Sequence, residues 1–218
     1  MGRCVMILGV PRSGTSAVAG VLHHLGIDMG NGHLQNGNRW NPRGYFEDLR
    51  WQKLNKQITG PRYGHRQPAT VSERQDAQYK ALADLCNVNW LWGMKDPRLC
   101  FTAQFIWPHL KDVRIVAVMR NPLSAAMSLM KHSHENYGGE DRMTIDQAIE
   151  LRDIWAGAME DRLTEFQGPV LRVFYEELVN RPTGLVKDLA TFAFDGLRAA
   201  WPDIEAGVQF VEPRLNHA

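Results

Sequence analysis

The stretch GVPRSGTSAV, residues 9–18, decides the fold of this chain. A phosphate-binding loop of the Walker A type follows the pattern G-x-x-x-x-G-K-[ST] and connects a strand to a helix. Gly9 and Gly14 keep that spacing, but Thr15 stands where the lysine would be. The stretch therefore predicts a turn that binds a phosphate-bearing ligand without a lysine at this position. A glycine turn that binds no ligand is the alternative.

The residues on both sides of this turn supply its setting. RCVMILGV, residues 3–10, is a continuous apolar run of the kind that forms a buried parallel strand. SGTSAVAGVLHHLG, residues 13–26, has helical periodicity and stops at Gly26. In a strand–turn–helix unit, the backbone N–H groups and the helix N-terminus bind an anion. The hydroxyls of Ser13, Thr15 and Ser16 and the Arg12 guanidinium would add to that site.

The rest of the chain alternates between predicted strands and predicted helices, and long loops are expected at 28–46 and 61–70. Further strands are predicted at 90–95, 113–119 and 168–175. Further helices are predicted at 47–58, 72–86, 121–133, 144–166 and 183–194, with Ser72 and Thr144 as caps. This alternation favours an α/β fold with a central parallel β-sheet flanked by helices. We expect one domain over residues 1–218.

Composition excludes several classes of partner. The formal net charge of +1 gives no general attraction to nucleic acid or to an anionic membrane, so an anion site must be local. No apolar run approaches the roughly 18 residues of a membrane span, and the apolar N-terminal run is expected to be a strand rather than a signal peptide. The three scattered cysteines, Cys4, Cys86 and Cys100, are typical of reduced thiols and predict a cytoplasmic protein.

A second stretch, VAVMRNPLSAAMSL at residues 116–129, points to another anion site. Arg120 ends a predicted buried strand, and Ser128 follows two helical turns later. In an open α/β sheet, ligands bind beyond the carboxyl ends of the strands, which is where both Arg120 and the glycine turn fall. A guanidinium there suits a second phosphate. A surface arginine paired with an acid is the alternative.

These stretches resemble the sulfotransferases that use 3′-phosphoadenosine-5′-phosphosulfate (PAPS), with similarity to bacterial members and to the tyrosylprotein branch. The 5′-phosphosulfate loop of that family is similar to PRSGTS, which comprises Pro11, Arg12, Ser13, Gly14, Thr15 and Ser16. Its 3′-phosphate motif is an arginine with a serine eight positions later, as in Arg120 and Ser128. Further similar segments are KDPR at 95–98, FYEELVNRP at 174–182, NPRGYFED at 41–48 and FVEPRLN at 210–216.

The resemblance implies a P-loop NTPase-like sulfotransferase fold and transfer of a sulfuryl group from PAPS, as co-substrate, to an acceptor hydroxyl or amine. The product would be 3′,5′-bisphosphoadenosine (PAP), and no metal would take part. Arg12 is assigned to the 5′-phosphate bridge and Lys95 to the leaving oxygen. The acceptor stays open among a small molecule, a carbohydrate, a lipid and a peptide, as does the oligomeric state. A P-loop-type small-molecule kinase and a non-catalytic nucleotide-binding protein are the alternatives.

The acceptor hydroxyl needs a general base, for which the sequence offers several candidates. They are Glu47, Asp48, His23, His24 and His65. Glu47 follows the long loop and is assigned as the base, although an acid at a helix start also suits the helix dipole. The two neighbouring histidines of the first helix cannot both face one site. The pair in HSH, residues 132–134, offers too few ligands for a metal site.

Overall fold

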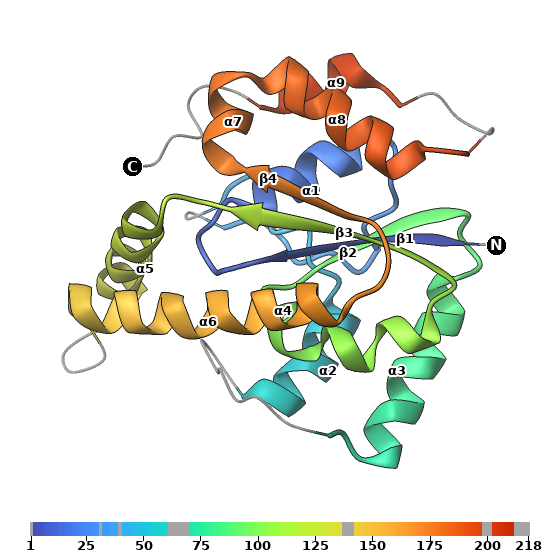
Figure 1. The fold of residues 1–218 in the computed structure, drawn as a ribbon, viewed down its shortest axis with the longest axis horizontal. Helices are drawn as coiled ribbons and strands as arrows, with labels where there is room; N and C mark the ends of the chain where they lie inside the picture. Colours follow the sequence, from blue (N-terminus) through green and yellow to red (C-terminus); the bar gives the residue numbers. More distant parts are fainter. Residues whose placement is uncertain are drawn as a thin grey trace.

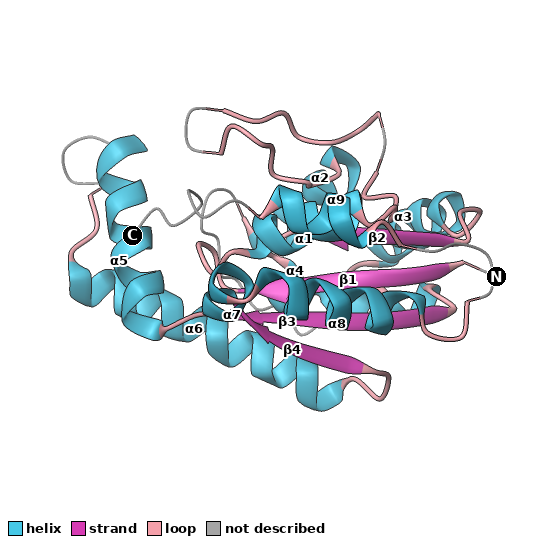
Figure 2. Cartoon of the chain, turned by 90° about the horizontal axis from the view of Figure 1, so that it is seen from above, coloured by secondary structure: helices cyan, strands magenta, loops and turns pink. Residues whose placement is uncertain are grey.

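The protein forms one parallel β-sheet in its computed structural model, which describes residues 2–30, 32–38, 41–60, 70–136, 142–197 and 202–211. The strand order is β2-β1-β3-β4 (Figure 2). The strands are β1 (Arg3–Gly9), β2 (Leu91–Lys95), β3 (Asp112–Met119) and β4 (Val170–Phe174). The predicted α/β fold with a central parallel sheet is thus confirmed.

Helices cover both faces of the sheet (Figure 1). On one face lie α1 (Thr15–His24), α7 (Tyr175–Asn180), α8 (Pro182–Phe194) and α9 (Ile204–Phe210). On the other lie α2 (Leu49–Thr59), α3 (Glu73–Cys86), α4 (Leu99–Thr102) and α6 (Ile145–Glu165). Helix α5 (Pro122–Asn136) lies beyond the end to which the strands point. No helix in the described ranges has the length and apolar character that crossing a membrane requires.

The core lies in two layers, one on each side of the sheet, and β1 contributes to both. Every residue of β1 is buried, with Cys4, Met6 and Leu8 in the layer beneath α2, α3, α4 and α6. Val5 and Ile7 belong to the opposite layer, with α1 and α8. A strand buried on both faces needs apolar side chains at every position, which explains its continuous apolar run.

The strand order places a crevice next to the glycine turn. From β1 the chain moves outward to β2 and then crosses to β3 on the other side of β1. The connections that leave β1 and β3 therefore go to opposite faces, which opens a space beyond their carboxyl ends. Gly9 pairs with Val118 in the register between these strands. The turn after Gly9 and the segment after Met119 thus start side by side.

Local signals at the helix starts were predicted well. Ser72 caps α3 and Thr144 caps α6, and each forms a capping box in which side chain and backbone bond reciprocally. The helix expected at 47–58 begins later, at Leu49, because Asp48 is its N-cap. Of the loop expected at 61–70, residues 61–69 lie outside the described part of the chain.

Two parts of the prediction were incomplete. The strand expected at 168–175 ends at Phe174, and Tyr175 instead begins α7. The short helices α4, α7 and α9 were not expected at all. Helices of four to seven residues show too few turns to reveal a periodic pattern, so tertiary packing rather than periodicity defines them.

Candidate active site

The glycine turn wraps tightly before α1. Arg12 and Gly14 both have left-handed backbone conformations, with φ angles of 70° and 88°. A Cβ atom on Gly14 would lie 2.1 Å from the Tyr175 ring, so this position accepts glycine alone. Gly14 is the N-cap of α1, and the first helical turn contains no acidic residue. The N–H groups of Thr15 and Ser16 have no intrahelical acceptor there, which favours an anion.

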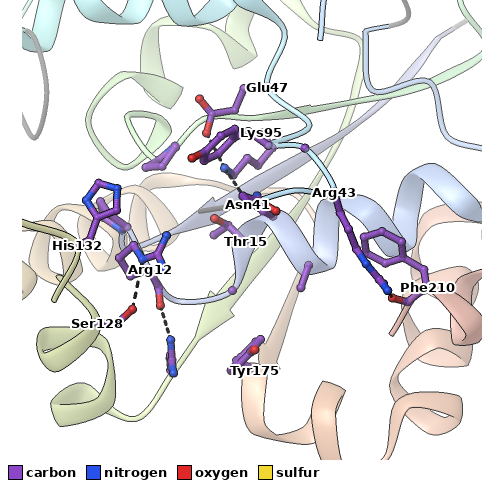
Figure 3. A pocket seen from close by; sticks show the side chains of 18 residues that line it. Arg12, Thr15, Asn41, Arg43, Glu47, Lys95, Ser128, His132, Tyr175 and Phe210 are labelled. Carbon is purple, nitrogen blue, oxygen red and sulfur yellow. Dashed lines mark hydrogen bonds and ion pairs between the residues drawn. The ribbon is translucent and has the colours of Figure 1, made fainter. Parts of the chain in front are cut away.

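A cavity of about 240 Å³ opens beyond the carboxyl ends of the strands (Figure 3). It brings together nearly all of the residues that the sequence assigned to the site. They are Pro11, Arg12, Gly14, Thr15, Ser16, Glu47, Lys95, Arg120 and Ser128. Ser13 is the exception, since its side chain is buried and lines a neighbouring cavity of about 220 Å³, which Arg120 also lines.

The residues assigned to the two phosphate sites contact one another directly. Arg120 Nη1 donates to the backbone oxygen of Arg12 at 2.7 Å, and Arg12 Nε donates to Ser128 Oγ at 3.2 Å. The Arg120 guanidinium also lies over the Tyr175 ring, 4.9 Å from its centroid. The glycine turn, the end of β3 and helix α5 therefore form one continuous cationic surface on the cavity wall.

A buried ion pair closes another side of the cavity. Lys95 Nζ lies 2.6 Å from Glu47 Oε1, and the two side chains are only 3% and 7% exposed. The same ammonium donates to Ser16 Oγ at 3.1 Å. Lys95 is the last residue of β2, so its position at the cavity follows from the parallel register with β1. The pair places a carboxylate and a cation next to the first turn of α1.

The backbone before Glu47 turns its side chain inward. Gly44 has a φ angle of 96°, and Phe46 has a φ of 54°, which is strained for a residue with a side chain. Asp48 points elsewhere: its carboxylate accepts from the Arg50 N–H and pairs with the Arg50 guanidinium. Asp48 is thus the cap of α2, whereas Glu47, considered as an acid that suits the helix dipole, faces Lys95.

Asp96 follows Lys95 but faces the protein interior. Asn55 Nδ2 donates to Asp96 Oδ2 at 3.0 Å, and Arg98 pairs with Oδ1 at 3.1 Å. Burial, followed by the nearby Glu47 carboxylate, raises the pKa of Asp96. The KDPR segment therefore presents Lys95 to the cavity and anchors itself through Asp96.

Of the other candidate bases, His23 and His24 do not line the cavity. His23 packs beside the Phe46 ring and His24 beside the Phe210 ring, with ring centroids 5.5 Å and 4.8 Å apart. Burial, and after it the neighbouring His23, lower the pKa of His24. His65 lies outside the described residues. Glu47 is thus the candidate that the structure brings to the cavity.

The cavity includes polar and aromatic side chains that were not among the assigned site residues. They are Asn41, Arg43, Tyr45, His132, Tyr175 and Phe210. His132 lies one helical turn after Ser128, and that spacing of four residues could have identified it. Burial, and then the Arg12 charge, lower the pKa of His132, so its imidazole is neutral near pH 7. Arg43 donates to the Phe210 backbone oxygen, which ties the mouth of the cavity to α9.

The chemistry of this lining favours an anionic ligand, because its described residues carry guanidinium, ammonium and hydroxyl groups and one carboxylate, that of Glu47. Within the described ranges, no three metal-ligating side chains come close enough together to hold an ion. The arrangement can neutralise phosphate charge along one wall and receive a proton at Glu47.

Comparisons with known proteins identify relatives of this chain in fold and in family. In structure the chain is similar to sulfotransferase STF9 from Mycobacterium avium, with a TM-score of 0.60 at 15% identity, covering 95% of this chain and 67% of that one. It is also similar to sulfotransferase STF1 from Mycobacterium tuberculosis H37Rv, with a TM-score of 0.56 at 14% identity over 100% and 72% of the two chains. At these identities the likeness concerns the fold.

No match was found among curated protein sequences. A family model described as the sulfotransferase family matches residues 4–199, which include the glycine turn, Glu47, Lys95, Arg120 and Ser128. Because this match spans most of the chain, the protein belongs to the sulfotransferase family.

Proposed function

We propose that this protein transfers a sulfuryl group from PAPS to an acceptor hydroxyl or amine. The observation that carries the proposal is the single cavity that the glycine turn, the Arg120–Ser128 wall and the Lys95–Glu47 pair line together. Family membership supports sulfuryl transfer in general. The identity of the donor and the roles of the residues are our inference from the chemistry of the cavity.

In this proposal the two phosphates of the nucleotide bind at different parts of the cationic wall. The 5′-phosphosulfate lies at the N-terminus of α1, where Pro11–Ser16 shape the loop and Arg12 neutralises the bridging phosphate. The 3′-phosphate lies near Arg120 and Ser128. When the nucleotide is present, the Arg12–Ser128 bond gives way to bonds with phosphate oxygens.

The transfer itself is a displacement at sulfur. The acceptor oxygen forms a bond to sulfur while the bond between sulfur and the bridging oxygen breaks, and its electron pair stays on the phosphate of PAP. Glu47 takes the acceptor proton, and Lys95 stabilises the charge that develops on the leaving oxygen. Positioning and electrostatics supply the catalysis, as in phosphoryl transfer.

A small-molecule kinase is the second candidate, because it shares a glycine turn of this kind. The Walker A lysine position is occupied by Thr15, which is 4% exposed and offers no ammonium. Lys95, which lines the cavity, is paired with Glu47. The lining therefore suits a donor of lower charge than a nucleoside triphosphate with magnesium. A nucleotide-binding protein without turnover is a third candidate, which a transfer assay distinguishes.

A ligand panel tests the proposal. PAP should bind and raise the unfolding temperature by mass action, whereas adenosine 5′-phosphate should bind much more weakly because it lacks the 3′-phosphate. ATP with magnesium should bind less tightly than PAP. Isothermal titration calorimetry measures all three. Equal affinity for PAP and adenosine 5′-phosphate would exclude the second phosphate site, and preference for ATP with magnesium would favour the kinase.

Arg120→Ala tests the second phosphate site alone. The variant should weaken PAP binding by on the order of 2–3 kcal/mol, as expected for a hydrogen bond between charged partners. Adenosine 5′-phosphate should lose far less affinity, because only the support of the Arg12 carbonyl is removed. Arg74→Ala, at an exposed arginine of α3, is the matched control and should change neither affinity. A similar loss for both nucleotides would instead indicate damage to the whole cavity.

A further inference from the structure

Gln52 contacts the carboxylate oxygen of Glu47 that Lys95 does not contact. It is in the first part of α2, and its side chain is buried, with the residue only 8% exposed. Gln52 Nε2 donates to Glu47 Oε2 at 2.7 Å, while Lys95 Nζ contacts Oε1 at 2.6 Å. Each carboxylate oxygen of Glu47 is therefore held by a different donor, one from the cavity side and one from the helix.

Lys56 fixes which way the Gln52 amide faces. Lys56 Nζ lies 2.6 Å from Gln52 Oε1, four residues away on α2. An ammonium group has only donors, so the atom opposite it must be the amide oxygen. The NH₂ group must consequently face the other way, toward Glu47. If the amide flipped, its NH₂ group would face the Lys56 ammonium, and two donors would oppose each other.

Gln35 completes this arrangement from the loop that precedes α2. Gln52 Nε2 also donates to Gln35 Oε1 at 2.8 Å, so the amide has a donor contact to Gln35 as well as to Glu47. The Gln35 N–H donates to the Glu47 backbone oxygen at 2.8 Å. The backbone and side chain of Glu47 are thus held by the same small network.

We infer that Gln52 is a positioning residue for Glu47, with Lys56 as the residue that fixes its orientation. This inference rests on the proposed function, in which Glu47 accepts the acceptor's proton. Gln52 binds Oε2 and leaves Oε1 directed at Lys95 and the cavity, where the proton arrives. Without Gln52, the Glu47 carboxylate would lose the donor that holds Oε2 and would be free to rotate. Its oxygen would then no longer stay within hydrogen-bond distance of the acceptor group whose proton it takes.

Gln52→Leu tests the inference through kinetics. Leucine has no hydrogen-bond donor, and its apolar side chain is similar in size to that of glutamine. The turnover number should fall by about 10- to 100-fold, the loss expected for one hydrogen bond to a charged group. PAP affinity should stay within a factor of about two, because Gln52 does not line the cavity. Gln57→Leu, at an exposed glutamine of the same helix, is the control and should retain full turnover.

Lys56→Met separates positioning from simple loss of structure. Without Lys56, the Gln52 amide loses one of the three contacts that fix its orientation, so turnover should fall, though by less than in Gln52→Leu. In the Gln52→Leu background, Lys56→Met should have no further effect, because its action passes through Gln52. Lys53→Met, at the neighbouring exposed lysine, controls for lost surface charge. The inference would be overturned if Gln52→Leu kept full turnover. It would also be overturned if this variant lost PAP affinity by the same factor as turnover.

A thermal unfolding cycle keeps the inference separate from the proposed function. Wild-type protein that does not bind PAP refutes the proposed function, whatever Gln52 does. The contact is then judged from Gln52→Leu, Glu47→Gln and the double variant. The shift in melting temperature of the double variant should differ from the sum of the two single shifts by about 3–12 °C, the shift for one hydrogen bond to a charged group in a domain of this size. Additive shifts would show that Gln52 does not hold Glu47.

Discussion

Glu47→Gln should lower the turnover number by roughly 10²- to 10⁴-fold, the usual contribution of a general base. The amide keeps the size of the side chain but cannot accept the acceptor's proton. PAP affinity should stay within a factor of about two, because Glu47 is assigned to neither phosphate. Initial rates with labelled PAPS and a screen of phenols, sugars and peptides measure the loss. Near-full turnover in this variant would refute the assignment of Glu47.

The structure supplies a matched control for this experiment. In Glu47→Gln the new side chain has one acceptor oxygen instead of two, so its NH₂ group must face a donor, either Lys95 or Gln52, and part of the loss would come from that mismatch. The exchange variant Glu47→Gln/Gln52→Glu restores a donor and an acceptor between the two positions and keeps the net charge. It should unfold near the wild-type temperature and remain inactive. Recovered turnover would mean that a carboxylate at position 52 can act as the general base in place of Glu47. Asp48→Asn should retain turnover, since Asp48 caps α2.

Lys95→Met should have the second-largest effect, on both activity and stability. Loss of the cation next to the leaving oxygen should lower turnover by at least about 10²-fold, as for other preorganised donors. The Glu47 carboxylate would also remain buried without its ion-pair partner, which costs about 3–5 kcal/mol of unfolding free energy. Denaturant unfolding and the same rate assay measure the two effects.

Two further variants distinguish the causes of that loss. Lys95→Met/Glu47→Gln removes both charges and should be more stable than Lys95→Met alone, yet equally inactive. Lys80→Met, at an exposed lysine paired with Asp84, should leave activity and stability unchanged. If Lys95→Met were as stable as the wild type, the Lys95–Glu47 pair would not be the buried contact that the structure shows.

The parts of the site that depend on local spacing could be predicted from the sequence. The Gly9–Gly14 spacing identified the turn, and the separation of eight positions from Arg120 to Ser128 identified the second wall. Both follow a buried strand, and the carboxyl ends of neighbouring parallel strands meet at one edge of the sheet. The sheet therefore followed from hydrophobic periodicity, the glycine turn from its spacing, and the pairing of Arg120 with Ser128 from the family resemblance.

The parts that depend on long-range contacts could not be predicted in the same way. Nothing near Glu47 in sequence shows that it faces Lys95 rather than serving only as an acid near the start of α2. The φ angle of 54° at Phe46 decides between Glu47 and Asp48, and periodicity carries no signal for it. Gln52 resembles any helical glutamine. Its function depends on the simultaneous positions of Glu47, Lys56 and Gln35.

A crystal structure of the chain with PAP tests the central claim most directly. The claim is that one cavity holds both phosphates of the nucleotide and presents the leaving oxygen to Lys95 and Glu47. We predict the 5′-phosphate at the N-terminus of α1, within about 3 Å of loop N–H groups, and the 3′-phosphate at similar distances from Arg120 and Ser128. A nucleotide bound away from the glycine turn, or with its 3′-phosphate held by Arg43 instead, would contradict it.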